Sequence, residues 1–171
     1  MDIHEKLKQA GFNPPPKPSK VDSKKANMQM KINKATQFLN AVEEYDNRLN
    51  SAPDKDTFLL LENSVVLNYE RFCESIKDIL DNIAVKENIT SLSDKRGLGE
   101  LIRETINILG IPLDVSNAVK KLTTRNDAVH DYINSEYYDE EVLKHVSNDI
   151  NEYKKYLNAI KNYLKSKNMI Q

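Results

Sequence analysis

Apolar residues recur every three or four positions along most of the chain, with polar residues between them. The first such stretch runs from Asp22 to about Asn50, and its apolar positions are Met28, Ile32, Ala35, Leu39 and Val42. This period places the apolar side chains on one face of an α-helix. The sequence at 51–54 then predicts a turn, and either Asp56 or Thr57 is expected to cap the next helix.

The second helical stretch has the longest apolar series, which comprises Phe58, Leu61, Val65, Leu67, Tyr69, Phe72, Ile76, Ile79, Leu80 and Ile83. Its middle is apolar on more than one side, which indicates a central position in a bundle. After an expected loop at about 86–95, the residues from Leu98 to Ile108 predict a third helix that ends near Gly110 and Pro112. A fourth helical region is expected to begin near Ser116.

Asp139 is expected to cap a last helix with a regular apolar stripe. The stripe comprises Val142, Val146, Ile150, Tyr153, Leu157, Ile160 and Leu164. The chain has only 4 Gly, whereas an all-β fold needs many glycine turns. Helical periods with short connections therefore predict an all-α, up-and-down bundle of about five helices.

The first 20 residues do not continue this pattern, because residues 13–18 read NPPPKP. Consecutive prolines cannot continue a helix and favour an extended chain. Residues 1–20 are therefore predicted to be a flexible N-terminal arm, and residues 21–171 to be one helical bundle domain. The arm is either a loosely ordered terminus or a segment that docks on a partner or second protomer.

Composition narrows the classes of function. The net charge of −1 provides no general attraction for nucleic acid, so a nucleic-acid site requires a local basic patch. The single cysteine, Cys73, excludes an internal disulfide and falls in a helical apolar pattern, where a small core residue is expected. The chain contains neither a secretory leader pattern nor an apolar run of membrane-spanning length, so a cytoplasmic protein without a membrane partner is expected.

The most informative sequence is TRNDAVHDY at 124–132, in which Arg125 and Asn126 precede His130 and Tyr132. This pattern resembles the R-x4-H-x-Y signature of the HEPN family (higher eukaryotes and prokaryotes nucleotide-binding). It is most similar to the toxin subgroup, whose antitoxin partner is a minimal nucleotidyltransferase. The architecture is similar over residues 25–165, and the sequence itself is similar only over 116–134.

The resemblance implies an HEPN-like bundle and a metal-independent endoribonuclease, acting as a toxin or defence effector with a composite site between two protomers. Its substrate would be RNA, and the products would carry a 2′,3′-cyclic phosphate. Tyr132 matches the position to which the nucleotidyltransferase attaches AMP, an adduct that would block RNA at Arg125. The alternative reading is a non-catalytic HEPN module that binds a nucleotide, RNA or a protein partner.

The residues themselves also supply the groups that RNA cleavage without a metal needs. His130 is the side chain suited to proton transfer near neutral pH, and Arg125 is permanently charged and binds phosphate oxygens. Asn126 is four residues before His130, on the same helix face, and can either orient the imidazole or help to hold the phosphate. Arg125 and His130 point about 140° apart on an ideal helix, which favours a shared site formed by two copies of the helix.

Nearby charges would assist or oppose RNA binding at this site. Lys120 and Lys121 extend a positive strip with Arg125, whereas Asp127 and Asp131 partly offset it. If the third and fourth helices pack together, Lys95, Arg96 and Arg103 would add to the strip.

The other candidates have plainer readings. His4 and His145 lack comparable neighbours and are read as surface or packing residues, and no cofactor or metal site is predicted. The motif itself can be read as a capped, solvated helix. The last helix is rich in Tyr and Lys, which predicts a packed face with a solvated side. Its alternative is a second RNA or protein contact surface.

Overall fold

A computed structural model describes residues 20–87, 98–110 and 135–171. These residues contain the helices α2 (Lys20–Leu49), α3 (Lys55–Lys86), α4 (Leu98–Leu109) and α6 (Ser135–Ser166), and no strand occurs among them. The all-α prediction is therefore confirmed for this part of the chain. The expected total of about five helices and the HEPN-like form of the bundle stay predictions. The arm predicted at 1–20 lies outside the described residues, apart from Lys20, with which α2 begins.

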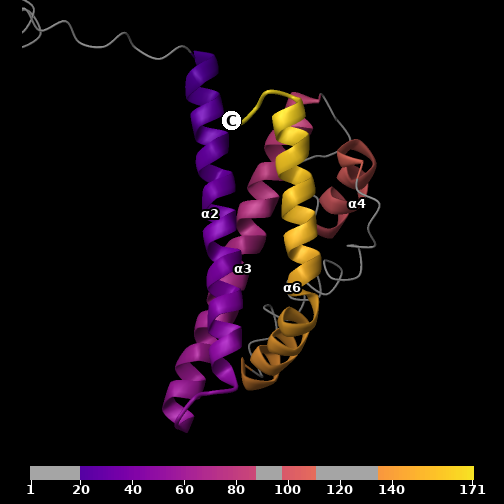
Figure 1. Cartoon of the computed structure of the whole chain (residues 1–171). Coiled ribbons are helices and arrows are strands. Elements are labelled where there is room, and N and C mark those ends of the chain that lie inside the picture. The colour runs from indigo at the N-terminus through magenta and orange to yellow at the C-terminus, as the bar shows by residue number, and fades with distance from the viewer. Residues whose placement is uncertain (1–19, 88–97, 111–134) are drawn as a thin grey trace, which may run out of the picture.

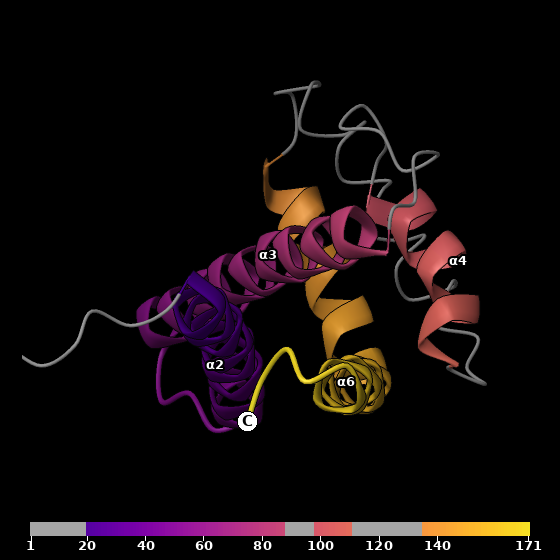
Figure 2. The same cartoon turned by 90° about the horizontal axis from the view of Figure 1, so that it is seen from above.

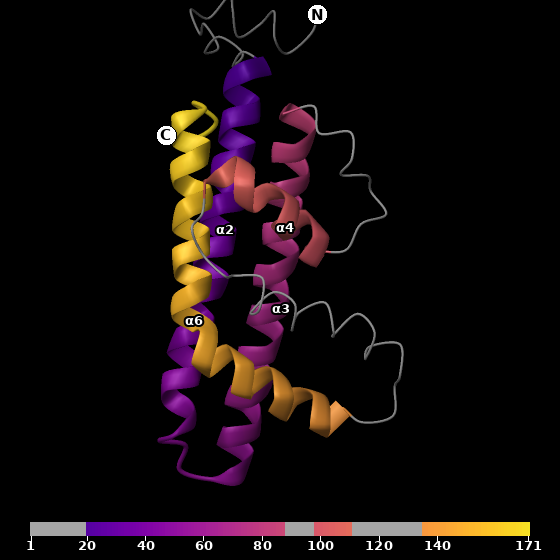
Figure 3. The ribbon, with the colours of Figure 1, turned by 90° about the vertical axis from the view of Figure 1, so that its right-hand side faces the viewer.

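Three long helices stand side by side and form the body of the molecule (Figure 1). Helices α2 and α3 form an antiparallel hairpin across the turn at residues 50–54, and α6 packs against both (Figure 2). Helix α6 runs antiparallel to α2, because Ser147 bonds Asp46 at 2.5 Å near one end and Asn168 bonds Lys25 at 2.7 Å near the other. The shorter α4 lies across the outside of α3 and α6 (Figure 3).

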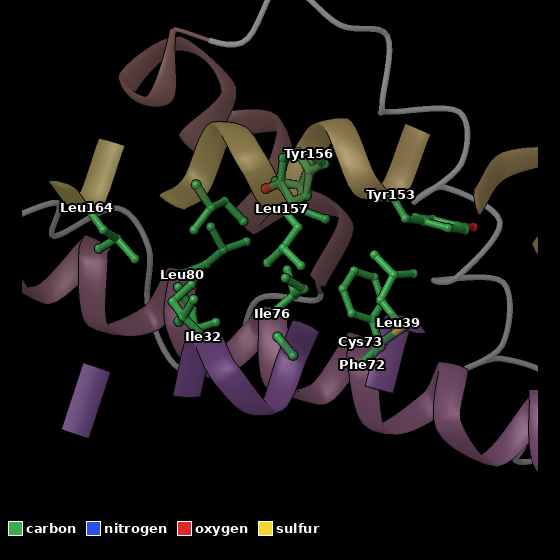
Figure 4. Packing of buried hydrophobic residues seen from close by; sticks show 14 of the residues in the cluster. Ile32, Leu39, Phe72, Cys73, Ile76, Leu80, Tyr153, Tyr156, Leu157 and Leu164 are labelled. Atoms are coloured by element: carbon green, nitrogen blue, oxygen red, sulfur yellow. The ribbon is translucent and has the colours of Figure 1, made fainter. Parts of the chain in front are cut away.

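The core lies where the faces of the three long helices meet (Figure 4). Helix α2 contributes the five apolar residues predicted from the sequence, and all five are buried: Met28, Ile32, Ala35, Leu39 and Val42. The predicted stripe of α6 is buried from Val146 to Leu164, while the Val142 side chain lies outside the described residues. Cys73 is 5 % exposed, which confirms its predicted place as a small core residue.

Helix α3 is central, as predicted, but two residues of its predicted apolar series are not in the core. Phe58 is 40 % exposed and Leu67 is 45 % exposed, whereas Leu61 and Val65 between them are buried. Because the first half of α3 is apolar on several sides, the sequence pattern alone does not show which of these sides faces the other helices.

Two helix starts differ from the predicted ones. Asp54 caps α3, because its carboxylate accepts a 2.7 Å hydrogen bond from the backbone N–H of Thr57. The prediction that Asp56 or Thr57 is the cap was therefore wrong. Helix α6 begins at Ser135, so Asp139 lies within the helix and is not its cap.

The C-terminal end of α6 is closed by a backbone motif that the sequence analysis did not include. Asn168 has a φ of 55°, in the left-handed region that asparagine tolerates better than most residues. The N–H of Asn168 donates to the Lys165 carbonyl at 2.9 Å, and that of Met169 donates to the Leu164 carbonyl at 2.8 Å. This is the Schellman pattern, which directs Met169 and Ile170 back into the core.

Candidate functional site

The residues of the predicted ribonuclease site lie outside the described residues. They are Lys120, Lys121, Arg125, Asn126, His130 and Tyr132, all within 111–134. The geometry of this set is therefore a prediction from the sequence. Lys95 and Arg96, predicted to extend the basic strip, also fall outside, whereas Arg103 is exposed on α4.

The described chain on both sides of this segment shows which elements it joins. Helix α4 ends at Leu109, and Gly110 follows with a φ of 62°, a conformation that glycine adopts without a Cβ penalty. The chain is described again from Ser135, where α6 begins, with Tyr137 and Tyr138 in its first turn. The motif thus connects the short outer helix α4 to the long helix α6.

Within the described residues, two tyrosines meet in the core between α3 and α6. The Tyr69 and Tyr153 hydroxyls are 2.5 Å apart, and their ring centroids are 5.3 Å apart. Phe72 meets the Tyr153 ring edge-on at 5.9 Å. Both tyrosines are almost fully buried, at 3 % and 1 % exposure. The pair satisfies two hydroxyls in an apolar interface, where an unpaired hydroxyl would be costly.

The surroundings keep these two hydroxyls protonated. Burial is the main cause that raises the pKa of Tyr69 well above its ordinary value, and the proximity of Cys73, Tyr153 and Asp149 raises it further. Burial also raises the pKa of Tyr153, against the hydrogen bond from Tyr69, which lowers it. A neutral tyrosine at physiological pH is a hydrogen-bonding group rather than a nucleophile or a base.

Two buried residues that carry hydroxyls, Thr105 and Tyr156, lie on α4 and α6. Thr105 is fully buried, and its hydroxyl donates to the Leu101 carbonyl at 2.6 Å. Burial raises the pKa of Tyr156, and the neighbouring Thr105 side chain opposes this increase. The Tyr156 hydroxyl is itself buried, and it forms no hydrogen bond within the described residues.

The tyrosines of the last helix belong to the core. Tyr153, Tyr156 and Tyr163 are buried, whereas Lys155 and Lys165 are exposed. The predicted packed face with a solvated side is thus confirmed. RNA bases cannot stack on these buried rings, and the alternative of a second RNA or protein contact surface on this helix stays a prediction.

The described residues offer few other chemical groups that could form a site. Neither His4 nor His130 lies among them, and for His145 only the backbone is described. In the described part of the chain, no three His, Cys, Asp or Glu side chains gather as metal ligands would. None of the helices described there is long and apolar enough to span a membrane.

Sequence reasoning did not find the tyrosine pair. The available signal was that Tyr69 and Tyr153 each fall on an apolar stripe, where a hydroxyl requires a partner. That they pair with each other depends on how α6 is set against α3, which no local pattern encodes. Comparisons with protein families, with curated proteins and with solved structures found no match to this chain.

Proposed function

We propose that this protein is a metal-independent endoribonuclease of the HEPN type, acting as a toxin or defence effector. The observation that carries the proposal is the sequence Arg125-Asn126 followed by His130 and Tyr132, set in an all-helical chain. Its position between a short helix and a long, amphipathic last helix supports the proposal, because a motif of this kind requires a rigid helical scaffold.

The reaction requires only the RNA's own 2′-hydroxyl as nucleophile. The 2′ oxygen forms a bond to phosphorus, the bond from phosphorus to the 5′ oxygen breaks, and the products are a 2′,3′-cyclic phosphate and a 5′-hydroxyl. In this proposal His130 transfers the proton of the 2′-hydroxyl to the departing 5′ oxygen. Arg125 stabilises the charge that develops on the phosphate oxygens. Asn126 orients the imidazole from the adjacent turn.

A homodimer is part of the proposal because one helix presents its two key residues in different directions. Arg125 and His130 diverge by about 140° on an ideal helix, so one copy converges poorly on a single phosphate. A two-fold axis would bring the Arg125 of one copy toward the partner subunit's His130 and build a cleft that both copies share. Lys120 and Lys121 would then extend the cleft along the RNA backbone.

Regulation by a nucleotidyltransferase antitoxin completes the proposal. Tyr132 is seven residues after Arg125 and returns to nearly the same helix face. AMP attached to its hydroxyl would place a phosphate beside the guanidinium and exclude RNA. Tyr137 and Tyr138 are close in sequence, so peptide mapping of the modified protein must separate the three positions.

The test is incubation of purified wild type and His130→Ala with structured RNA in EDTA, followed by analysis of the product ends. We expect cleavage by wild type alone, leaving cyclic phosphate. His145→Ala is the matched control, because it removes another histidine and should leave cleavage unchanged. Equal cleavage by His130→Ala would contradict the assignment.

A second readout addresses the alternative of a non-catalytic module. If wild type binds RNA or a nucleotide without turnover, and Arg125→Ala abolishes that binding, the protein is a binding module. The same preparation should be examined by mass spectrometry, because an AMP adduct on the Tyr132 peptide would account for absent cleavage by a silenced toxin.

A further inference from the structure

The first half of α3 carries most of the exposed large apolar side chains among the described residues. Six large apolar side chains are exposed among the described residues, and four of them lie in one ten-residue stretch of α3, residues 58–67. They are Phe58, Leu59, Leu60 and Leu67. Leu60 is 69 % exposed, and on an ideal helix only Leu60 and Leu67 of these four point to the same side, about 20° apart.

Two leucines and two charged residues share the outward face of this half of α3. Asp56, Leu60, Leu67 and Arg71 are all exposed, and on an ideal helix they point within about 60° of one another. Their order is acidic, apolar, apolar, basic, and the two outer intervals have equal length. When two copies of this helix lie antiparallel, the acidic end of each faces the basic end of the other, and the leucines face leucines.

We propose that this outward face of α3 is a surface on which a second copy of the chain docks, antiparallel, about a two-fold axis. The axis passes near Asn63 and Ser64, midway between the two leucines. Leu60 of one copy then packs on the partner subunit's Leu67, and Asp56 faces the partner subunit's Arg71. Each contact occurs twice, as a two-fold interface requires.

The residues at the centre and at one end of the surface suit this arrangement. Ser64 is small, and its hydroxyl donates to the Leu60 carbonyl at 2.7 Å, so its donor remains satisfied when the surface is covered. The Arg71 guanidinium lies over the Phe38 ring of α2, 6.0 Å from the centroid. This contact holds the cation at the end of the outward face while leaving it exposed.

The size of the surface sets the expected strength. From Asp56 to Arg71 an ideal helix rises about 22 Å, so a single helix from each copy supplies a small interface. Interfaces of this class associate weakly. We expect a concentration-dependent equilibrium between monomer and dimer.

The first experiment measures this equilibrium for the full chain by sedimentation velocity. Leu60→Glu and Leu67→Glu should each weaken association by more than about tenfold, because each replaces two buried leucines per dimer with charges. Val85→Glu is the matched control, since Val85 is 79 % exposed near the other end of α3 and should associate as wild type does. A wild-type monomer at all accessible concentrations, or a dimer unaffected by Leu60→Glu, would overturn the proposal.

The second experiment tests the antiparallel register by exchanging charges. Asp56→Arg and Arg71→Asp each place like charges opposite one another and should weaken self-association by about tenfold. An equimolar mixture of the two variants restores both opposite-charge pairs, and should form a heterodimer as stable as the wild-type dimer. A mixture that associates no better than either variant alone would contradict this register.

This interface is separable from the proposed ribonuclease site. His130→Ala should dimerise as wild type does, whether or not the protein cleaves RNA. If Leu60→Glu cleaves RNA at concentrations where it no longer self-associates, the ribonuclease does not require the α3 dimer, and the α3 proposal is unaffected. Wild-type association with no cleavage would contradict only the ribonuclease.

Discussion

The two interfaces made by the buried side of α3 differ in chemistry. Toward α2 the contact is built from aliphatic side chains, such as Ile32, Leu39 and Val42, which are all nearly or fully buried. Toward α6 the interface includes the hydroxyl pair of Tyr69 and Tyr153. An aliphatic contact depends mainly on the area and volume that are buried, whereas a buried hydroxyl pair also requires protonated, correctly placed groups. The α6 interface should therefore weaken when its tyrosines ionise, whereas the aliphatic contacts with α2 should not depend on tyrosine ionisation.

Alkaline pH should produce the largest effect. Tyr69, Tyr153 and Tyr156 have raised pKa values in the folded chain, so the unfolded chain loses these protons first. The stability that they contribute is complete below the ordinary tyrosine pKa of about 10 and is lost as pH rises through the folded values. Tyrosinate absorbance and far-ultraviolet circular dichroism should therefore change together. Ionisation of every tyrosine with helicity intact would contradict this expectation.

Leu39→Ala should have the next largest effect and involve only the α2 interface. Leu39 is 2 % exposed, and removing a buried leucine side chain costs about 2–5 kcal/mol of unfolding free energy. Denaturant unfolding of the variant measures the loss. Leu60→Ala is the control, because the same change at a residue 69 % exposed should leave monomer stability nearly unchanged.

Tyr153→Phe should have a smaller effect and involve only the α6 interface. It removes one hydroxyl and leaves that of Tyr69 buried without this partner, at a cost of about 1–3 kcal/mol. Replacing both tyrosines should cost less than the sum of the single changes, because no orphan hydroxyl then remains. Denaturant unfolding of the two single variants and the double variant gives this coupling directly. Additive losses of unfolding free energy would show that the two hydroxyls have no energetic coupling.

Asp54→Ala should have the smallest effect, because it alters an exposed helix end outside both interfaces. The hydrogen bonds from Thr57 lower the pKa of Asp54, so its contribution is present above the unfolded value and is lost as pH falls through the folded one. A slight decrease in Tm is expected at neutral pH, and it should disappear in acid. Asp56→Ala should change Tm less than Asp54→Ala, and the reverse order would identify Asp56 as the cap.

The accuracy of the sequence predictions follows from how local each signal is. The stripe of α6 was predicted correctly from Val146 onward because a helical period needs no information from the rest of the chain. The exposure of Leu67 was not predicted, because α3 is apolar on several sides and only the placement of α2 and α6 selects the buried one. The Tyr69–Tyr153 pair spans 84 positions and was missed for the same reason.

The candidate site illustrates a different kind of prediction. Arg125, Asn126, His130 and Tyr132 were selected by residue type and spacing, and these lie outside the described residues. Spacing on one helix indicates which side chains share a face, but the convergence of two copies depends on a tertiary arrangement that spacing does not contain. The ribonuclease assignment therefore depends on the His130→Ala experiment.

The short turn between α2 and α3 has a consequence for the order of folding. Contacts in this hairpin join neighbouring elements, whereas α6 must find partners as distant as Lys25, 143 positions away from Asn168. Closing a long loop costs more entropy than closing a short one, so local contacts form sooner. During synthesis the hairpin can be complete before α6 has left the ribosome. Pulse-labelled hydrogen exchange should then show protected amides in α2 and α3 before those of α6. The Tyr69–Tyr153 hydrogen bond should form last, when α6 packs on α3.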